Sequence, residues 1–306
     1  MSRAQVPRHF LGLPAPAKLN LFLHVLGRRP DGYHDIESVF VPLDLCDTLD
    51  LVERHDGAIV REGDLTGPPD DDLAVRAARA LQAYAQTQGL PAPAGVTLRV
   101  SKRIPVGAGL GGGSSDAATT LLGLNRLWGL ALTRAQLAVL ARGLGADVPF
   151  FLGDGPAFVE GVGERCTALP LAPAAYVLIY PQVHVSTVEI FTDPKLTRDT
   201  KPTTIAGFSA ALQAGAGVGV SLAPAGFGTN DLEAVVRRRF AAVDQALRLL
   251  APLGPARMSG SGSAVFVAAT DEAQARLWLQ QLRPQLPAAW SAWVVSSLAA
   301  LPLADW

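Results

Sequence analysis

The sequence predicts a two-lobed α+β fold with a cleft between the lobes. The chain has 306 residues, enough for two lobes or for one large domain. Strand and helix patterns alternate along it, as they do in α/β and α+β proteins. A glycine-rich segment at 105–118 joins a strand pattern to an apolar helix pattern. We place the lobe boundary near residue 160, which gives lobes of 1–160 and 161–306.

The first lobe is expected to begin with two strands. An apolar run at 18–26 predicts the first, which ends at the turn signal Arg29-Pro-Asp-Gly32. A second strand pattern covers 36–45. These two strands and their turn form the predicted opening of the fold.

Three helices and one further strand complete the first lobe. The first helix covers 72–88, with Asp72 as its N-cap. A strand at 96–100 then leads into the glycine-rich segment and its helix. Thr133-Arg-Ala-Gln136 forms a capping box for the next helix, and Gly145 ends that helix.

The second lobe also alternates strands and helices. Asn230 and Glu233 are expected to cap a helix that extends to Leu247. The Ala- and Gly-rich stretch 206–228 has little periodicity and predicts a mobile loop. The remaining elements, in order, are a strand at 176–180, a strand at 263–268, a helix from Asp271 and a strand at 293–295.

Composition and charge exclude several classes of partner. The net charge is −1 and no basic run is present, so no nucleic-acid partner is expected. Cys46 and Cys166 lack the spacing of a metal site and cannot make a disulfide framework. No apolar stretch reaches membrane-spanning length and the N-terminus lacks a signal pattern. We therefore expect a soluble, cytoplasmic protein with no membrane partner.

The most informative segment is a glycine-rich turn that runs directly into an apolar helix. It reads Pro105-Val-Gly-Ala-Gly-Leu-Gly-Gly-Gly-Ser-Ser-Asp-Ala-Ala118. Glycines at 107, 109, 111, 112 and 113 let the backbone curl tightly. The N–H groups and dipole of a helix N-terminus favour an anion, and Ser114 and Ser115 add hydroxyls. The segment therefore predicts a polyphosphate-binding loop, here called the phosphate loop (residues 105–115).

Three other interpretations of the phosphate loop are weaker. A Walker A loop would continue with Gly-Lys-Ser or Gly-Lys-Thr, which is absent. Three of the glycines satisfy G-x-G-x-x-G, but the preceding strand breaks at 102–105 and no acidic residue lies between Asp116 and Asp147. A flexible linker would not have apolar patterns on both sides.

The phosphate loop resembles the P-x-x-x-G-L-G-G-G-S-S loop of the GHMP kinases (the galactokinase, homoserine, mevalonate and phosphomevalonate kinase superfamily). Two further segments match: the first motif, Pro16-Ala-Lys-Leu-Asn-Leu-Phe-Leu23, and the third motif, Met258-Ser-Gly-Ser-Gly-Ser-Ala-Val-Phe266. The resemblance implies a two-lobed GHMP kinase fold with an active-site cleft, and ATP and Mg²⁺ as cofactors. It implies that ATP is bound by Pro105, Gly107, Gly109, Leu110, Gly111, Gly112, Gly113, Ser114 and Ser115. The ligands of Mg²⁺ stay open, with Ser114, Ser115 and Asp116 as candidates.

Other segments are similar to one family of GHMP kinases, the 4-diphosphocytidyl-2-C-methylerythritol kinases. They are Lys18-Leu-Asn-Leu, Gly27-Arg-Arg-Pro-Asp-Gly-Tyr-His34, Glu37-Ser-Val-Phe40, Gly145-Ala-Asp-Val-Pro149 and Glu160-Gly-Val-Gly163. The resemblance implies ATP-dependent phosphorylation of the 2-hydroxyl of this small-molecule substrate, a cytidine diphosphate-linked methylerythritol, in the methylerythritol phosphate route to isoprenoids. The chain is expected to act as a monomer or homodimer.

The same resemblance implies that Lys18 and Asp147 are catalytic. Asp147 would accept or orient the proton of the substrate hydroxyl. Lys18 would favour the charged carboxylate or stabilise the transferring phosphoryl group, and the sequence leaves both roles open. Without the resemblance, a turn-holding Asp147 and a surface Lys18 would be the simpler interpretations.

A cytidine clamp is also implied by the family. Tyr33 and Phe191 match the positions that sandwich the base, and His34 matches the position that reads its edge. Asn20 would contact the methylerythritol portion, and Thr187 would lie near the base and its ribose. Taken alone, each aromatic residue is better explained by ordinary packing, and His34 by a satisfied histidine.

Two rival functions fit the sequence less well. Another GHMP kinase, for mevalonate, homoserine or a sugar, would share the phosphate loop but give no reason for Asp31-Gly-Tyr-His34. A non-catalytic nucleotide-binding regulator should have lost Lys18, Asp147 or the loop, and all are present. Gly260-Ser-Gly262 is expected to bring a second glycine turn against the phosphate loop, with a purely structural hairpin as the alternative.

Overall fold

Two β-sheets with helices on their outer faces make up the molecule. The computed structural model describes residues 8–64, 67–90, 93–215 and 228–306. The first sheet has the order β3-β4-β2-β5-β6, with β1 paired to β2. Its strands are β1 (His9–Arg28), β2 (His34–Arg54), β3 (Ile59–Gly63), β4 (Gly95–Ser101), β5 (Ala157–Gly161) and β6 (Arg165–Ala168). All pairs are antiparallel except β3 with β4.

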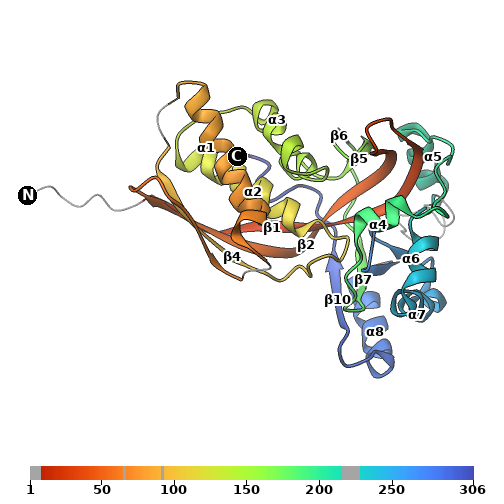
Figure 1. The fold of residues 1–306 in the computed structure, drawn as a ribbon. Coiled ribbons are helices and arrows are strands. Elements are labelled where there is room, and N and C mark those ends of the chain that lie inside the picture. The colour runs from red at the N-terminus through yellow and green to blue at the C-terminus, as the bar shows by residue number, and fades with distance from the viewer. Residues whose placement is uncertain (1–7, 65–66, 91–92, 216–227) are drawn as a thin grey trace, which may run out of the picture.

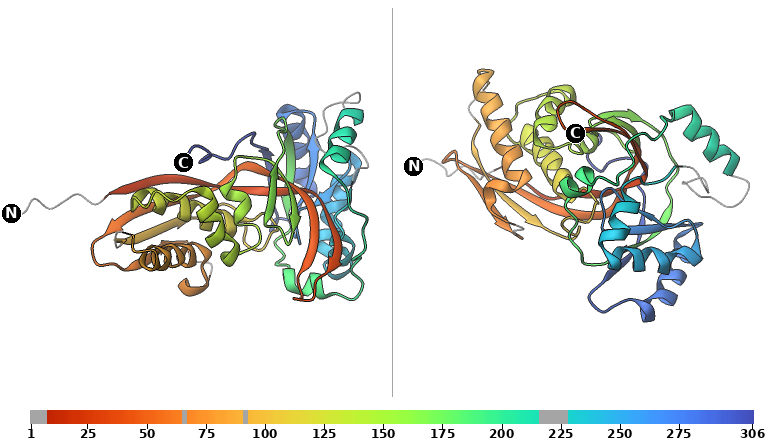
Figure 2. Two further views of the ribbon diagram at one scale, coloured as in Figure 1. Left: turned by 90° about the horizontal axis from the view of Figure 1, so that it is seen from above. Right: turned by 45° about the vertical axis from the view of Figure 1, so that its right-hand side comes forward.

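Three helices pack on one face of this sheet (Figure 2). They are α1 (Leu73–Thr87), α2 (Gly112–Leu127) and α3 (Arg134–Leu144). Their ends confirm the capping signals in the sequence. The Asp72 side chain accepts a hydrogen bond from the N–H of Ala74 at 2.8 Å, the capping box of Thr133 and Gln136 is formed, and α3 ends at Gly145.

The second sheet has the order β10-β7-β9-β8. It comprises β7 (Ala175–Tyr180), β8 (Arg257–Met258), β9 (Val265–Ala269) and β10 (Ser291–Ser296). The helices of this half are α4 (Thr187–Thr192), α5 (Ile205–Gly215), α6 (Glu233–Arg239), α7 (Ala241–Leu250) and α8 (Glu272–Leu282). The predicted strands at 176–180, 263–268 and 293–295 and the helix from Asp271 are confirmed.

The two sheets share a core because β7 is buried on both faces. Successive side chains of a strand point to opposite faces. Val177 and Ile179 pack with α6, α7 and α8, whereas Tyr176 and Leu178 pack against residues of β1 and β2 such as Leu19. One core lies between the first sheet and helices α1–α3 (the first core), and another between the second sheet and helices α6–α8 (the second core). The long strands β1 and β2 extend from the first core into the second (Figure 2).

Both proposed lobes exchange segments near their predicted boundary. β5 runs across residue 160, β6 follows it, and both belong to the first sheet. After β10 the chain returns to the first half, where the N–H of Leu301 donates to the carbonyl of Asp154 at 2.7 Å and the Arg134 guanidinium donates to that of Leu303 at 2.8 Å. The division into 1–160 and 161–306 stays a prediction.

The structure corrects two predicted elements of the second half. Helix α5 (Ile205–Gly215) overlaps the first part of the stretch 206–228 predicted to be a mobile loop. Thr204 caps its start by accepting from the N–H of Gly207 at 2.9 Å. Residues 216–227 lie outside the described residues. The Ala- and Gly-rich composition gives no clear helical periodicity, so the sequence did not predict this helix. The helix buries Phe208 beside Phe22.

The helix predicted from 230 to Leu247 is two helices. α6 ends at Arg239, Phe240 adopts an extended backbone with φ −129° and ψ 93°, and α7 follows. Neither Gly nor Pro marks this break in the sequence; Phe240 packs against the second core instead. Asn230 does not cap α6 as predicted, because the N-cap of α6 is Leu232, two residues later, and it has no side-chain cap. The Oδ1 of Asn230 instead accepts from the N–H of Leu232 in the turn before the helix, and its amide group donates to the third motif.

Candidate active site

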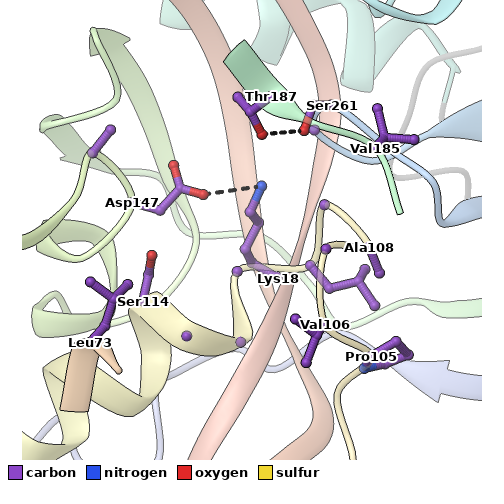
Figure 3. Close-up of a pocket in the computed structure, with 18 of the residues that line it drawn as sticks. Lys18, Leu73, Pro105, Val106, Ala108, Ser114, Asp147, Val185, Thr187 and Ser261 are labelled. Atoms are coloured by element: carbon purple, nitrogen blue, oxygen red, sulfur yellow. Dashed lines mark hydrogen bonds and ion pairs between the residues drawn. The ribbon is translucent and has the colours of Figure 1, made fainter. Parts of the chain in front are cut away.

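A cavity of about 530 Å³ lies where β1, the phosphate loop, the turn after α3, α4 and the third motif meet. Lys18 and Asp147 point toward one another across it, and the loop residues Pro105, Val106 and Ala108 form the adjoining wall (Figure 3). Thr187 and Ser261 close another side, joined by a hydrogen bond of 2.8 Å. Three motifs that are far apart in the sequence thus line one cavity.

The phosphate loop owes its path to glycines with left-handed backbone. Gly107, Gly109 and Gly111 have φ of 66°, 76° and 71°. A Cβ on Gly109 would lie 2.1 Å from the carbonyl oxygen of Ser259, so the loop could not approach the third motif with any other residue there. α2 begins directly after Gly111, and no side chain caps this end in the described structure. Its first N–H groups are therefore suited to bind an anion.

The third motif braces the phosphate loop, as the sequence predicts. The Ser259 hydroxyl donates to the carbonyl of Gly109 at 3.0 Å, and the N–H of Ala264 donates to that of Ala108 at 3.0 Å. Buried Asn230 in turn donates to the carbonyls of Met258 and Gly260, both at 2.8 Å. This set of contacts fixes the distance between the two glycine turns.

Lys18 reaches the cavity because β1 is irregular at this point. The β1–β2 pairing shifts between Pro16 and Lys18, and the N–H of Lys18 donates to the carbonyl of Leu110 in the phosphate loop at 2.9 Å. A bulge of this kind redirects a side chain. Proline is tolerated here because β1 pairs only with β2 in the described sheet.

The Lys18 ammonium is buried among three partners. Its side chain is 3% exposed, and Nζ lies 3.4 Å from Oδ2 of Asp147. It also donates to Oδ1 of Asn20 and lies 4.6 Å from the ring centroid of Phe40. Burial lowers the pKa of Lys18 below its ordinary value, and the charge of Asp147 opposes that shift. A surface lysine is thereby excluded.

The turn after α3 presents the Asp147 carboxylate. Gly145 ends the helix, and Asp147 follows with a side chain that is 29% exposed. It is therefore accessible from the cavity, whereas its partner Lys18 is not accessible from bulk water. The arrangement offers an acceptor for a proton and a fixed positive charge behind it.

The two serines of the phosphate loop diverge. Ser114 lines the cavity, but Ser115 is fully buried and does not line it. Adjacent residues of a helix point about 100° apart, which accounts for the difference. No described residue hydrogen-bonds the Ser115 hydroxyl.

The predicted substrate residues reach the cavity in part. Asn20, Thr187 and Phe191 line it. His34 is buried with its ring centroid 5.1 Å from that of Phe191, and its Nε2 accepts from Nε of Arg198 at 3.1 Å. Tyr33 is 62% exposed on the β1–β2 turn and does not line the cavity.

The environment of His34 favours a neutral imidazole. Burial and the nearby charges of Arg198 and Arg28 lower the pKa of His34. Because Nε2 accepts a hydrogen bond, the neutral ring carries its proton on Nδ1. His34 can therefore donate from that atom.

Sequence reasoning missed an ionic cluster at the base of the phosphate loop. The Lys102 ammonium donates to Asp47 and, at 2.7 Å, to Oδ2 of Asp116. Asp47 also accepts from the N–H groups of Arg103 and Ile104 at 2.6 and 2.8 Å. Burial raises the pKa of Asp116 to about 7, against the charge of Lys102. The signal available was Lys102 itself, one of four lysines in an arginine-rich chain.

Comparison with protein-family models gives the class of the protein. Residues 72–155 match the model for the GHMP kinases N terminal domain, and residues 208–287 match the model for the GHMP kinases C terminal domain. Solved structures agree: the mevalonate kinase of Methanococcus jannaschii superposes with a TM-score of 0.67 over 97% of this chain and 100% of that chain, at 13% identity. The chain is a GHMP kinase by fold and by sequence.

More similar relatives narrow the class to one family. The 4-diphosphocytidyl-2-C-methyl-D-erythritol kinase of Paraburkholderia phytofirmans is 49% identical over 94% of both chains, and that of Burkholderia cenocepacia HI2424 is equally so. A crystal structure of a 4-(cytidine 5'-diphospho)-2C-methyl-D-erythritol kinase is 34% identical, covering 95% of this chain and 99% of that chain, with a TM-score of 0.73. This chain belongs to the 4-diphosphocytidyl-2-C-methyl-D-erythritol kinase family.

Among the described residues, no helix combines the length and apolarity needed to cross a membrane.

Proposed function

We propose that this chain transfers the γ-phosphoryl group of ATP to the 2-hydroxyl of 4-diphosphocytidyl-2-C-methyl-D-erythritol, within the methylerythritol phosphate route to isoprenoids. The names of its relatives support this proposal. The observation that carries it is the placement of Lys18, Asp147 and the N-terminus of α2 around one cavity that Phe191 also lines. An anion site, a proton acceptor and an aromatic face are what such a transfer requires.

The chemical step follows from the positions of Lys18 and Asp147. The substrate oxygen forms a bond to the γ-phosphorus while the bond from that phosphorus to the β–γ bridging oxygen breaks, and ADP leaves. Asp147 accepts the proton of the substrate hydroxyl. Lys18, fixed by Asn20 and Asp147, stabilises charge at the reacting centre. Direct in-line transfer uses no phosphorylated protein side chain.

The phosphate loop would hold the triphosphate at the N-terminus of α2. Pro105, Leu110 and the glycines at 107, 109, 111, 112 and 113 line the cavity together with Ser114, and these are the proposed ATP-binding residues. Ser115 belongs to the same motif, but its hydroxyl faces the interior. We therefore assign Ser115 a role in loop structure and leave phosphate contact to the others.

Mg²⁺ is proposed as the ion that accompanies ATP. The described residues contain no group of three or more His, Cys, Asp or Glu side chains that could hold a metal ion by themselves. Mg²⁺ commonly takes most of its ligands from phosphates and water, with few from protein. The Ser114 hydroxyl on the cavity wall fits that need as an oxygen donor. Bound there, the ion would neutralise developing phosphate charge.

His34 and Phe191 are the proposed recognition elements for cytosine. Phe191 gives a flat face at the cavity, and His34, 5.1 Å away, offers a donor at Nδ1 to the base edge. Exposed Tyr33 is proposed to cover the other face of the base once it is bound. Asn20 and Thr187 would contact the methylerythritol and ribose portions.

A substrate panel tests this function. Coupled ADP release with Mg-ATP would be compared for the diphosphocytidyl methylerythritol, mevalonate and homoserine. We expect turnover only with the cytidyl compound. Turnover with another alcohol would discard the roles of Tyr33, His34 and Phe191, and nucleotide binding without any turnover would favour a regulator. The cytoplasmic location, the monomer or homodimer and the absence of nucleic-acid partners stay predictions of the sequence.

A further inference from the structure

The segment Glu37-Ser-Val-Phe40 of β2 sends two side chains toward the catalytic lysine. β2 runs antiparallel to β1, with Phe40 opposite Asn20 and Ser38 opposite Leu23. Residues two apart in a strand share a face. The Phe40 ring lies 4.6 Å from Nζ of Lys18, and the Ser38 hydroxyl reaches the side chain of Asn20.

Ser38 determines which way round the Asn20 amide lies. Its hydroxyl donates to the carbonyl of Phe22, which can only accept. Oγ can then only accept a further hydrogen bond, and it accepts one from Nδ2 of Asn20 at 3.0 Å. Oδ1 of Asn20 must then face the other way, and there it accepts from the Lys18 ammonium. Ser38 is 0% and Asn20 1% exposed, so water does not replace either bond.

We propose that Ser38 is a positioning residue for phosphoryl transfer: its hydroxyl orients the Asn20 amide so that Oδ1 holds the Lys18 ammonium in the cavity. This inference rests on the proposed function for the role of Lys18. The chain of bonds runs from the Phe22 carbonyl through Ser38 and Asn20 to Nζ. Asp147 then takes a second N–H of the ammonium.

Loss of the Ser38 hydroxyl would leave the buried amide group of Asn20 without an acceptor. A buried unpaired donor is costly, and rotation of the amide would place NH₂ against the ammonium. Two donors would then face each other, which disfavours the charged lysine. Lys18 is sensitive to this change because burial already lowers its pKa.

The other described neighbours of Lys18 would not compensate for the loss of the hydrogen bond from its ammonium to Asn20. Asp147 is the charged group that faces it, from the turn after α3. The Cys166 thiol of β6 is neutral, because desolvation by the surrounding protein and the negative charges of Asp147 and Glu164 raise its pKa to about 12. Phe40 and the turn at Gly260 add no charge.

Lysine NMR reads this effect without any substrate. The chain has four lysines, so ¹³Cε-labelled lysine gives four titrating signals, and a Lys18→Arg variant assigns the one of interest. In Ser38→Ala we expect the titration midpoint of Lys18 to fall by about one pH unit or more, since hydrogen bonds to charged groups are worth that much. The other three lysines should titrate unchanged. The basic limb of the kcat profile should move down with Lys18.

Ser297→Ala is the matched control. Ser297 is also buried, and its hydroxyl accepts from the N–H of Ala174, remote from the cavity lining. It should lose stability and leave the Lys18 midpoint where it is. Ser38→Cys, close in shape with a weaker donor and acceptor, should shift Lys18 in the same direction by less, and serves if Ser38→Ala does not fold.

An unmoved Lys18 midpoint in the folded Ser38 variants would overturn the proposal. A shift of equal size in Ser297→Ala would do the same, because it would show a general effect of packing. Failure of the wild-type protein to phosphorylate the cytidyl substrate would instead refute the proposed function, and the NMR titration would still decide whether Ser38 orients Asn20.

Discussion

Replacement of Asp147 by Asn tests the catalytic pair most sharply. The side chain keeps its shape, loses its charge and can no longer accept a proton. At the observed 3.4 Å between Nζ and Oδ2, and with an effective dielectric constant of about 20, the attraction to Lys18 is about 5 kcal/mol. The net loss of stability is smaller, about 1–2 kcal/mol, because the Asp147 carboxylate is partly open to water and a buried lysine without its partner can lose its proton.

We expect kcat of Asp147→Asn to fall by about 10²–10⁴-fold, which is the usual contribution of a positioned base. KM for ATP should change by no more than about threefold, since the phosphate loop is untouched. Tm should fall by only a few degrees. Coupled ADP release and a thermal melt measure all three.

Asp154→Asn is the control, because that residue is exposed and absent from the cavity lining. It should behave as the wild type. Asp147→Asn with kcat within about threefold of wild type, in a folded protein, would refute the assignment of Asp147 as the base.

Three further predictions follow from the same geometry. Gly109→Ala should raise KM for ATP by more than about tenfold and should lower Tm. The new Cβ would lie 2.1 Å from the Ser259 carbonyl oxygen, at a backbone φ of 76°. The control Gly143→Ala adds its Cβ in open space and should change neither quantity. Steady-state kinetics and melts would show it, and a normal KM would contradict the close approach. Phe191→Ala should weaken binding of cytidine diphosphate by about tenfold in calorimetry and spare ATP, while Val188→Ala on the exposed face of α4 should spare both; equal binding by both variants would remove Phe191 from the clamp. Burial lowers the pKa of both His24 and His34, so the unfolded chain binds more protons than the folded protein below about pH 6.5. Tm should therefore fall as the pH drops from 6.5 to 5, and the fall should be shallower in His34→Gln. An identical slope in that variant would count against a buried neutral His34.

Local signals in the sequence predicted the elements that depend on local chemistry. The capping box at Thr133 and Gln136, the cap at Asp72 and the left-handed glycines of the phosphate loop are decided by residues a few positions apart. Three ordered motifs also placed Lys18 and Asp147 in one site, through the resemblance rather than through spacing. Their separation of 3.4 Å is set by a β1 bulge that no pattern shows.

Long-range contacts account for what the sequence did not show. Asp47 and Lys102 are 55 residues apart, and nothing near Asp47 indicates that it anchors the phosphate loop. Helix α5 carries few polar residues to define a face, and the break at Phe240 follows from packing against the second core. Asn is common at helix caps, but α6 begins after Leu232, and Asn230 lies in the preceding turn, where its amide group donates to the third motif.

The site of phosphorylation tests the central claim most directly. C2 of the methylerythritol portion carries a methyl group and no hydrogen, so a phosphate ester at the 2-hydroxyl has no proton three bonds from phosphorus. The ³¹P NMR spectrum of the wild-type reaction with Mg-ATP should show the γ resonance replaced by one new monoester singlet alongside ADP. A proton-coupled multiplet would place the phosphate on another hydroxyl and contradict the substrate orientation around Asp147, and an unchanged ATP spectrum would contradict the kinase activity itself.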